Sequence, residues 1–197
     1  VVNVTTDGTT AAFADNSAAQ AATVFDVKLA DAGASVTLGA NGDIVYGGAG
    51  IDVIDAKAGS DIVVITDSTT AQDTIVISTA GDTATATVNN NGGAATLDTG
   101  DTVVGDFDVI LGFQHSEDKL NILSLNSSGA SGDSVGGLAA NEYEVVRGSW
   151  DEGTNTFTVN TASGTDQIVI FDDGANDIAV VLLGITDFDS SDFYAVP

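Results

Sequence analysis

The 197-residue chain has 29 acidic residues against four basic ones, a formal net charge of -25, and no cysteine. The basic residues form no cluster, which argues against nucleic acid and anionic membrane surfaces as partners and leaves divalent cations as the natural counter-charge. Without cysteine the chain has no disulfide, no thiol catalysis and no thiolate metal site.

Short runs rich in Val, Ile and Thr, bounded by Gly, Asp, Asn and Ser, predict strands joined by turns along most of the chain. The runs lie at residues 24–29, 62–65, 74–77, 156–159 and 167–171. The Ala-rich residues 11–23 favour a helix or a loop, and little other helix is expected. The longest apolar stretch, residues 178–185, is far shorter than the ~20 residues of a membrane helix. Because the first residue is not Met, we expect a processed product or an excised piece.

A repeat occupies residues 38–66. Asp43, Asp52 and Asp61 are nine residues apart, and each is followed two residues later by Val or Ile. Residues 47–55 fit the pattern Gly-Gly-x-Gly-x-Asp-x-apolar-x at every defined position. Nonapeptide repeats of this kind are typical of parallel β-helices that bind calcium. The alternative is a Gly/Asp-rich hairpin turn that holds no metal.

Each position of the repeat has a physical reason. Six residues form a turn, where glycine permits positive φ and close backbone approach, and three form a short strand. Aspartate supplies the hard oxygens that Ca²⁺ prefers. Two repeats complete one coil, so Asp43 and Asp61 should share one edge and Asp52 the opposite edge. Asp73 comes three residues late but keeps the Asp-x-apolar order, so it is the candidate partner of Asp52. The candidate metal ligands are Gly39, Asn41, Asp43, Gly48, Gly50, Asp52, Gly59, Asp61 and Asp73.

These residues resemble the RTX (repeats-in-toxin) family of calcium-binding proteins exported by type I secretion. Residues 108–122 look like the segment that follows the repeats in serralysin-type C-terminal domains. Residues 171–184 resemble the acidic turn and apolar strand of the family, and residues 191–197 resemble the C-terminus of type I secretion substrates. The chain departs from the family in having only three repeats and in carrying Ala56-Lys57 where Gly-Gly is expected.

The repeat and the resemblance together predict an all-β fold, a short parallel β-roll capped by antiparallel strands. We expect an N-terminal β flank at residues 1–37, the calcium-binding roll and its strand extension at 38–125, and an antiparallel capping region with a secretion-signal-like end at 126–197. The cofactor implied is Ca²⁺.

The predicted function is that of a secreted structural module, located outside a bacterium or on its surface, that folds on calcium after export. It would contribute to a surface layer, an extracellular filament or an adhesin, and would not itself be an enzyme. Its partners would be calcium ions and further copies of itself, or other cell-surface proteins or glycans, with no nucleic acid and no membrane insertion. The alternative is the C-terminal secretion and folding module of a secreted hydrolase whose catalytic domain lies outside this chain.

Two catalytic motifs occur without their context. Residues 132–136, around Ser134, match the Gly-x-Ser-x-Gly nucleophile elbow, which needs a strand before it and a helix after it, but lie in a Ser/Gly loop. Residues 97–100, around Asp98, resemble the tripeptide of aspartic proteases, but occur once where two carboxylates must share a proton. His115 is the single histidine, too few for a zinc protease, and we expect it in a turn or at the surface.

Three further groups are open to a structural and a functional interpretation. Asp187, Asp189 and Asp192 begin like an EF-hand but lack its Gly and final Glu, so a solvated acidic turn is favoured. A second acidic turn spans residues 172–177 and could make weak calcium contacts. Trp150 and Tyr143 are expected on a strand face or in the core, whereas exposure of both would favour glycan binding.

Overall fold

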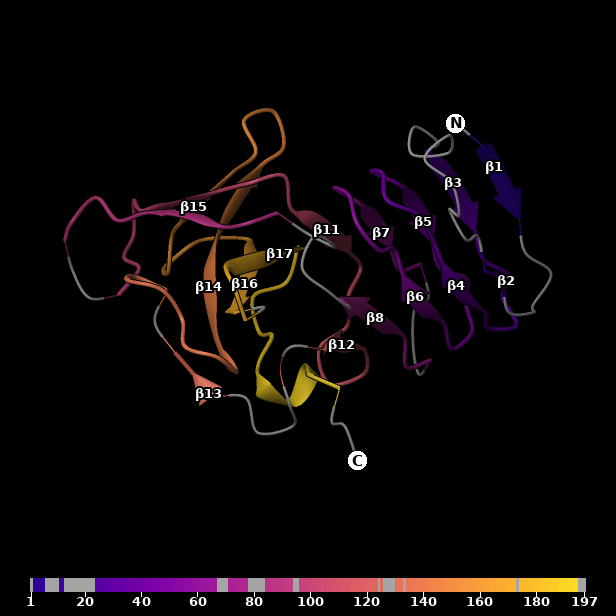
Figure 1. Cartoon of the computed structure of the whole chain (residues 1–197). Helices are drawn as coiled ribbons and strands as arrows, with labels where there is room; N and C mark the ends of the chain where they lie inside the picture. The colour runs from indigo at the N-terminus through magenta and orange to yellow at the C-terminus, as the bar shows by residue number, and fades with distance from the viewer. Residues whose placement is uncertain are drawn as a thin grey trace.

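The computed structural model describes residues 2–5, 11–12, 24–66, 71–77, 84–93, 96–123, 125, 130–132, 134–172 and 174–194. This part of the chain is all-β apart from one 3₁₀-helix, η1 (Figure 1). The elements are β1 (Val2–Thr5), β2 (Ala11–Ala12), β3 (Phe25–Lys28), β4 (Ser35–Thr37), β5 (Ile44–Tyr46), β6 (Val53–Asp55), β7 (Ile62–Val64), β8 (Thr74–Ile77), β9 (Thr87–Asn89), β10 (Thr102–Val104), β11 (Asp108–Leu111), β12 (Lys119–Ile122), β13 (Ala130–Ser131), β14 (Glu142–Asp151), β15 (Thr156–Val159), β16 (Asp166–Asp172), β17 (Asp177–Leu183) and η1 (Ser190–Asp192).

All five runs expected to be strands contain one. Of the Ala-rich residues 11–23, the first two form β2, and residues 13–23 lie outside the described part. No helix within the described part has the length and apolar character needed to cross a membrane.

Two sheets hold the strands. The mixed sheet has the order β1-β3-β5-β7-β11-β17-β16-β14-β15-β10-β9, with β13 paired to β14, and the parallel sheet has the order β12-β8-β6-β4-β2. From β1 to β8 the chain alternates between the two sheets, and β11 and β12 resume this alternation after β9 and β10. Figure 1 shows the two layers of parallel strands at one side of the molecule and the antiparallel strands β14 to β17 at the other.

The register of the parallel strands reflects the nine-residue repeat. Ile44 pairs with Ile62 in the mixed sheet, and Ser35 pairs with Val53 in the parallel sheet. From β3 to β7 in the mixed sheet and from β4 to β6 in the parallel sheet, neighbouring strands are therefore two repeats apart in the sequence, so each pair of repeats makes one coil.

The main core fills the space between the two sheets. Its centre is two rows of aliphatic side chains in register, one from each sheet and each side chain at most 2% exposed: Val27, Val45, Val63 and Ile110 face Val36, Ile54, Ile75 and Leu120. Each such residue stabilises the fold by about 1.5–3 kcal/mol relative to an exposed position. The apolar eighth residue of each repeat, expected in the interior, is Val45, Ile54 or Val63.

A second core lies on the other face of the mixed sheet, where β15, β10 and β9 contribute. Phe107 and Phe157 are fully buried there against Val181 and Ile168. The long strand β14 serves both halves of this sheet, because it pairs with β16 up to Gly148 and with β15 beyond it. A Cβ at Gly148 would lie 2.3 Å from the Thr158 carbonyl oxygen, so the strand changes partners where the side chain is missing.

Candidate functional site

Two stacks of buried aspartates line the edges where the parallel strands begin. The first aspartate stack comprises Asp43, Asp61 and Asp108, at the starts of β5, β7 and β11. The second aspartate stack comprises Asp52, Asp73 and Asp118, at the starts of β6, β8 and β12. All six residues are at most 2% exposed.

In the first aspartate stack, each carboxylate accepts a hydrogen bond from a backbone N–H of the preceding coil. Asp43 Oδ1 accepts from the N–H of Phe25 at 2.7 Å, and Asp61 Oδ1 accepts from the N–H of Asp43 at 2.6 Å. Asp108 Oδ1 then accepts from the N–H of Asp61 at 2.9 Å. The carboxylate thus satisfies the N–H at the strand start, which the sheet does not pair.

The second aspartate stack repeats this arrangement on the other edge. Asp52 Oδ1 accepts from the N–H of Ala34 at 2.7 Å, and Asp73 Oδ1 accepts from that of Asp52 at 2.8 Å. Asp118 Oδ1 accepts from the N–H of Asp73 at 3.0 Å. Asp52 and Asp73 are therefore neighbours although they are 21 residues apart, which confirms the expected placement of Asp73 beside Asp52.

The turns before these aspartates are also stacked, with clearance that only glycine allows. A Cβ at Gly48 would lie 2.2 Å from the Ala30 carbonyl oxygen, and one at Gly50 would lie 2.2 Å from the backbone nitrogen of Gly33. On the opposite edge, a Cβ at Gly59 would lie 2.7 Å from the carbonyl oxygen of Asn41.

The structure therefore distributes the nine candidate ligands over two edges. Gly39, Asn41 and Gly59 belong to the turns that lead into Asp43 and Asp61 in the first aspartate stack. Gly48 and Gly50 form the turn before Asp52 in the second aspartate stack, where Asp73 follows one coil later. The Gly48 N–H also donates to Asp52 Oδ2 at 2.8 Å, which ties the turn to its own aspartate.

Sequence reasoning missed Asp108 and Asp118 as members of the stacks. The hydrogen bonds that bring them there span 47 and 45 residues, well beyond the nine-residue period. Both nevertheless carry the local order of the repeat, an aspartate followed two residues later by an apolar residue, here Ile110 and Leu120. That short pattern is the signal that could have found them.

Six carboxylates out of water need compensation, because burying a charged group is unfavourable unless it is hydrogen-bonded or paired. The backbone N–H groups supply part of it. Asp55 forms an ion pair with Lys57, and Asp192 forms one with His115. Neither of these two pairs includes a residue of either stack. The groups gathered at each edge are carboxylate and backbone carbonyl oxygens, the donor set of Ca²⁺ rather than of zinc or copper. Oxygen donors of this kind suit a hard cation, although within the described residues the group of three side chains whose donor atoms converge within 4.8 Å is His115, Asp189 and Asp192.

Both catalytic motifs lie in hydrogen-bonded turns. Ser134 is 2% exposed, and its hydroxyl donates to Glu144 Oε2 at 2.5 Å in a turn that follows the two-residue strand β13 and does not lead into a helix in the described residues. Asp98 is exposed in a turn, where its N–H donates to Asp101 Oδ2 at 2.8 Å. Asp101 is buried and holds this loop.

His115 lies in the expected turn and joins the C-terminal segment to the coil. Its Nδ1 lies 2.8 Å from Asp192 Oδ2, and the Ser116 N–H donates to Asp192 Oδ1 at 2.8 Å. The hydrogen bond to Asp192 raises the pKa of His115 above 6.5, and the charges of Asp192, Asp187 and Asp189 act in the same direction against desolvation.

The acidic turn at residues 187–192 caps the 3₁₀-helix η1. Asp189 and Asp192 form a capping box around this 3₁₀-helix, and Asp192 is fully buried. Donor atoms of His115, Asp189 and Asp192 lie within 4.8 Å of one another, so the group could also hold a metal ion. Each oxygen of Asp192 already accepts a backbone hydrogen bond, from Ser116 or from Asp189.

The second acidic turn and the two aromatic residues also have structural roles. Asp177 accepts from the N–H of Leu138 at 3.0 Å, and Asp172 accepts from that of Gly174 at 2.8 Å, whereas Asp173 lies outside the described residues. The Tyr143 ring packs edge-on against Phe193 at 4.6 Å, and the Trp150 ring lies 5.7 Å from Phe107. Both are half-buried and packed, as expected of strand-face or core aromatics.

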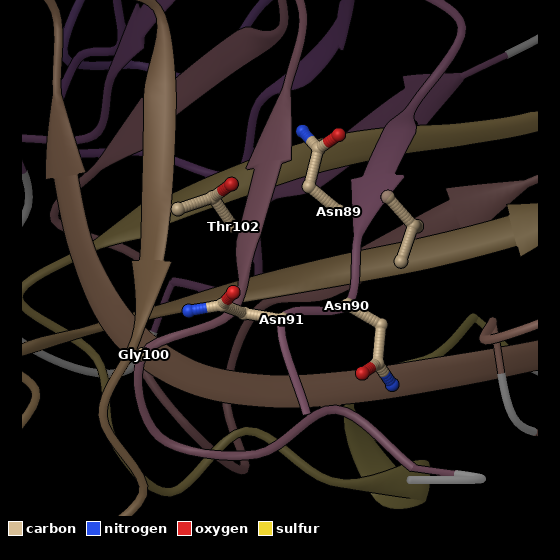
Figure 2. A pocket seen from close by; sticks show the side chains of 6 residues that line it. Asn89, Asn90, Asn91, Gly100 and Thr102 are labelled. Atoms are coloured by element: carbon tan, nitrogen blue, oxygen red, sulfur yellow. The ribbon is translucent and has the colours of Figure 1, made fainter. Parts of the chain in front are cut away.

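An open polar pocket of about 570 Å³ lies at the β9 edge of the mixed sheet. Asn89 and Thr102 are cross-strand partners there, and Figure 2 shows their side chains side by side, with Asn91 below them. Asn90 is already used by its loop, since its side-chain oxygen accepts from the N–H groups of Gly92 and Gly93. The lining residues are neutral hydrogen-bonding groups, a poorer match to a cation than the aspartate stacks.

Comparisons of the chain with protein-family models, with curated proteins and with solved structures find no match. The functional argument therefore depends on the arrangement of residues described above.

Proposed function

We propose that this chain is a secreted, calcium-dependent structural module, an RTX-type parallel β-roll capped by antiparallel strands. The observation that carries the proposal is the pair of aspartate stacks. Each stack repeats one carboxylate per coil, buried at the edge of the sheet and next to glycine turns that stack backbone on backbone. A hairpin with a Gly/Asp-rich turn would form one such turn and would not repeat this environment on two edges.

Calcium would be held between turns of successive coils. On the first edge the ligands would come from Asp43, Asp61 and the turn residues Gly39, Asn41 and Gly59. On the second edge they would come from Asp52, Asp73, Gly48 and Gly50. The bound ion supplies positive charge that offsets the mutual repulsion of the carboxylates, and Ca²⁺ in extracellular modules binds in the weak range of about 10⁻⁴–10⁻³ M.

Weak affinity suits a module that folds after export. Inside the cell, where free calcium is scarce, the net charge of -25 works against compaction, and outside, calcium binding becomes folding free energy. The module has no catalytic role in this proposal. β1 and β2 are the outermost strands at the same end of the two sheets, and exposed strand edges can pair with another chain. These edges support a place in a surface layer, filament or adhesin.

The test is far-UV circular dichroism of the metal-free chain, titrated with calcium and separately with magnesium. We expect a β signal that develops, or gains thermal stability, with calcium and is reversed by chelator, with little response to magnesium because Mg²⁺ demands a stricter octahedral geometry. A spectrum and a melting temperature that are the same in chelator and in calcium would rule the proposal out. Sedimentation of the same samples tests assembly separately.

A further inference from the structure

The outer face of the mixed sheet carries an apolar row that runs out from the second core. Ile44, Ile62, Val109 and Val181 pair in register across β5, β7, β11 and β17. Val181 and Val109 are 0% and 9% exposed under the second core, whereas Ile62 and Ile44 are half-buried further along. Their strand neighbours face the main core, so this row lies on the opposite face of the sheet. The second core therefore does not cover the far end of this row, where Ile62 and Ile44 are partly exposed.

A pocket of about 400 Å³, here called the lateral pocket, lies where the second core ends. The pocket is lined by two residues of the apolar row, Ile62 and Val109, and by Leu111 next to them on β11; these three are called its floor. Trp150 of β14 and Glu152 also line it. Its volume is in the range of about 300–1,000 Å³ found for ligand sites. The pocket also reaches Asp61, so the proposed calcium site is next to it.

Trp150 contributes an aromatic side chain to the lateral pocket. Its Nε1 is buried, and within the described part of the chain it has no hydrogen-bond partner. A buried indole N–H usually finds an acceptor, because the unmade bond is unfavourable. Asn155, which also lines the pocket, is engaged with Asp106 through its side-chain amide. Because this nitrogen is buried, a ligand in the open pocket would contact the carbon atoms of the indole ring and not its N–H group.

The rim of the lateral pocket is negatively charged. Glu152 lines it and is exposed, and Asp151 and Asp106 are exposed nearby in sequence and in contact with the same loop. Lys and Arg are only four in the whole chain, whose net charge is -25. Complementary charge favours a basic partner and opposes a second copy of this chain.

We propose that the lateral pocket binds an extended basic segment of another protein, with a large apolar side chain on Ile62 and Val109 and a neighbouring Lys or Arg facing Glu152. An extended segment alternates its side chains, so one can cover the apolar residues of the pocket while its neighbour faces the charged rim. This interaction surface goes beyond the calcium-dependent folding proposed above and does not depend on it.

The chain reports on this pocket directly, because Trp150 is its single tryptophan. The probe is an acetylated and amidated Lys-Phe-Lys-Phe-Lys peptide, titrated into the folded protein at saturating calcium while the indole emission is followed. We expect a saturable change of emission that weakens as ionic strength rises. Ile62→Thr should weaken binding about fourfold through lost apolar area, and Glu152→Gln about two- to fivefold through the lost rim charge.

Matched variants and probes make the outcome decisive. Val53→Thr changes an exposed aliphatic residue on the outer face of the parallel sheet, and Asp187→Asn removes an exposed carboxylate elsewhere, so both should bind as the parent does. The proposal is overturned if the emission does not saturate, or if a Glu-Phe-Glu-Phe-Glu peptide binds equally well. It is also overturned if 2-phenylethylamine alone matches the peptide, which would make this a small-molecule pocket. Circular dichroism of each variant separates loss of binding from loss of fold.

Discussion

Replacing Asp61 separates the two roles that its carboxylate can have. Asp61 is 1% exposed in the middle of the first aspartate stack, where Oδ1 accepts the Asp43 N–H at 2.6 Å. Asp61→Asn keeps an oxygen acceptor and nearly the same volume but removes the charge that calcium needs. Asp61→Ala removes both. Both variants therefore lose calcium-dependent stability, and Asp61→Ala also loses the hydrogen bond, which does not depend on calcium.

The magnitudes follow from the geometry. Asp61→Ala leaves the buried Asp43 N–H without its acceptor, which costs about 1–3 kcal/mol at every calcium concentration. Asp61→Asn avoids this loss because the side-chain amide oxygen can accept the same hydrogen bond. Removing a buried charge also offsets part of any other destabilisation that the substitution causes. The deficit that comes from the lost calcium ligand, which both variants share, should grow with calcium, by about 1.4 kcal/mol at tenfold and about 2.7 kcal/mol at a hundredfold excess over the dissociation constant of one site.

The assay is urea unfolding followed by circular dichroism, repeated from low to high calcium. The slope of the free energy of unfolding against the logarithm of calcium concentration counts the ions bound on folding, and it should fall for Asp61→Asn. The control is Asp98→Asn, which removes an exposed carboxylate and should keep the parent slope. A deficit of Asp61→Asn that is constant over all calcium concentrations would refute the reasoning, because the carboxylate would then act only as a hydrogen-bond acceptor.

Three further predictions concern other parts of the fold. Gly48→Ala should destabilise the chain by about 1–3 kcal/mol in urea unfolding, because the added methyl group meets the carbonyl of the stacked turn at 2.2 Å. Phe113→Ala should lose about 3–5 kcal/mol in the same assay, since this ring is 2% exposed in the main core. Protonated His115 stabilises the C-terminal segment; because its pKa is raised in the folded chain, this contribution is complete below about pH 6.5 and is lost as pH rises through the higher folded pKa. Amide hydrogen exchange, corrected for its intrinsic pH dependence, should therefore show less protection of residues 188–194 above that pH.

Each of these predictions has a matched control. Gly92→Ala places a methyl group in open space and should be nearly neutral, and Leu123→Ala removes a side chain that is 54% exposed. His115→Gln keeps a side chain that can donate to Asp192 but cannot titrate, so the pH dependence of the exchange should disappear. Equal losses at Gly48 and Gly92, or unchanged pH dependence in His115→Gln, would contradict the corresponding interpretation.

The sequence predicted the local repeat of the parallel coils but not how the coil continues. The nine-residue spacing of Asp43, Asp52 and Asp61 is a local period, so it correctly assigns edges and neighbours, and it even tolerates the three-residue delay before Asp73. Asp108 reaches the first aspartate stack only after the excursion through β9 and β10. Periodicity carries no information about where an excursion returns.

The second core shows the same limit. β10 pairs with β15, so residues 102–104 lie against residues 156–158. Each strand is recognisable from its alternating side chains, but their pairing depends on the change of partner of β14 at Gly148 and on the packing of Phe107 and Phe157 in the second core. These are properties of three-dimensional packing, which no local pattern specifies.

The hydrogen bonds of the aspartate stacks all point the same way along the coil, and this gives the module a direction of assembly. From Phe25 to Asp73, each of six N–H groups at or next to a strand start, such as that of Asp43, is satisfied by the carboxylate of the coil that follows it. When a coil is added at the N-terminal end, its strand-start N–H can bond at once to a carboxylate of the coil already folded. A coil that folds before the coil that follows it has a strand-start N–H without that acceptor. Ordering should therefore propagate like a zipper from the C-terminal end, where the Tyr194 N–H bonds the Leu120 carbonyl and fixes the last coil. Deleting coils from the N-terminus should leave a folded remainder, and deleting the C-terminal strands should prevent the zipper from starting.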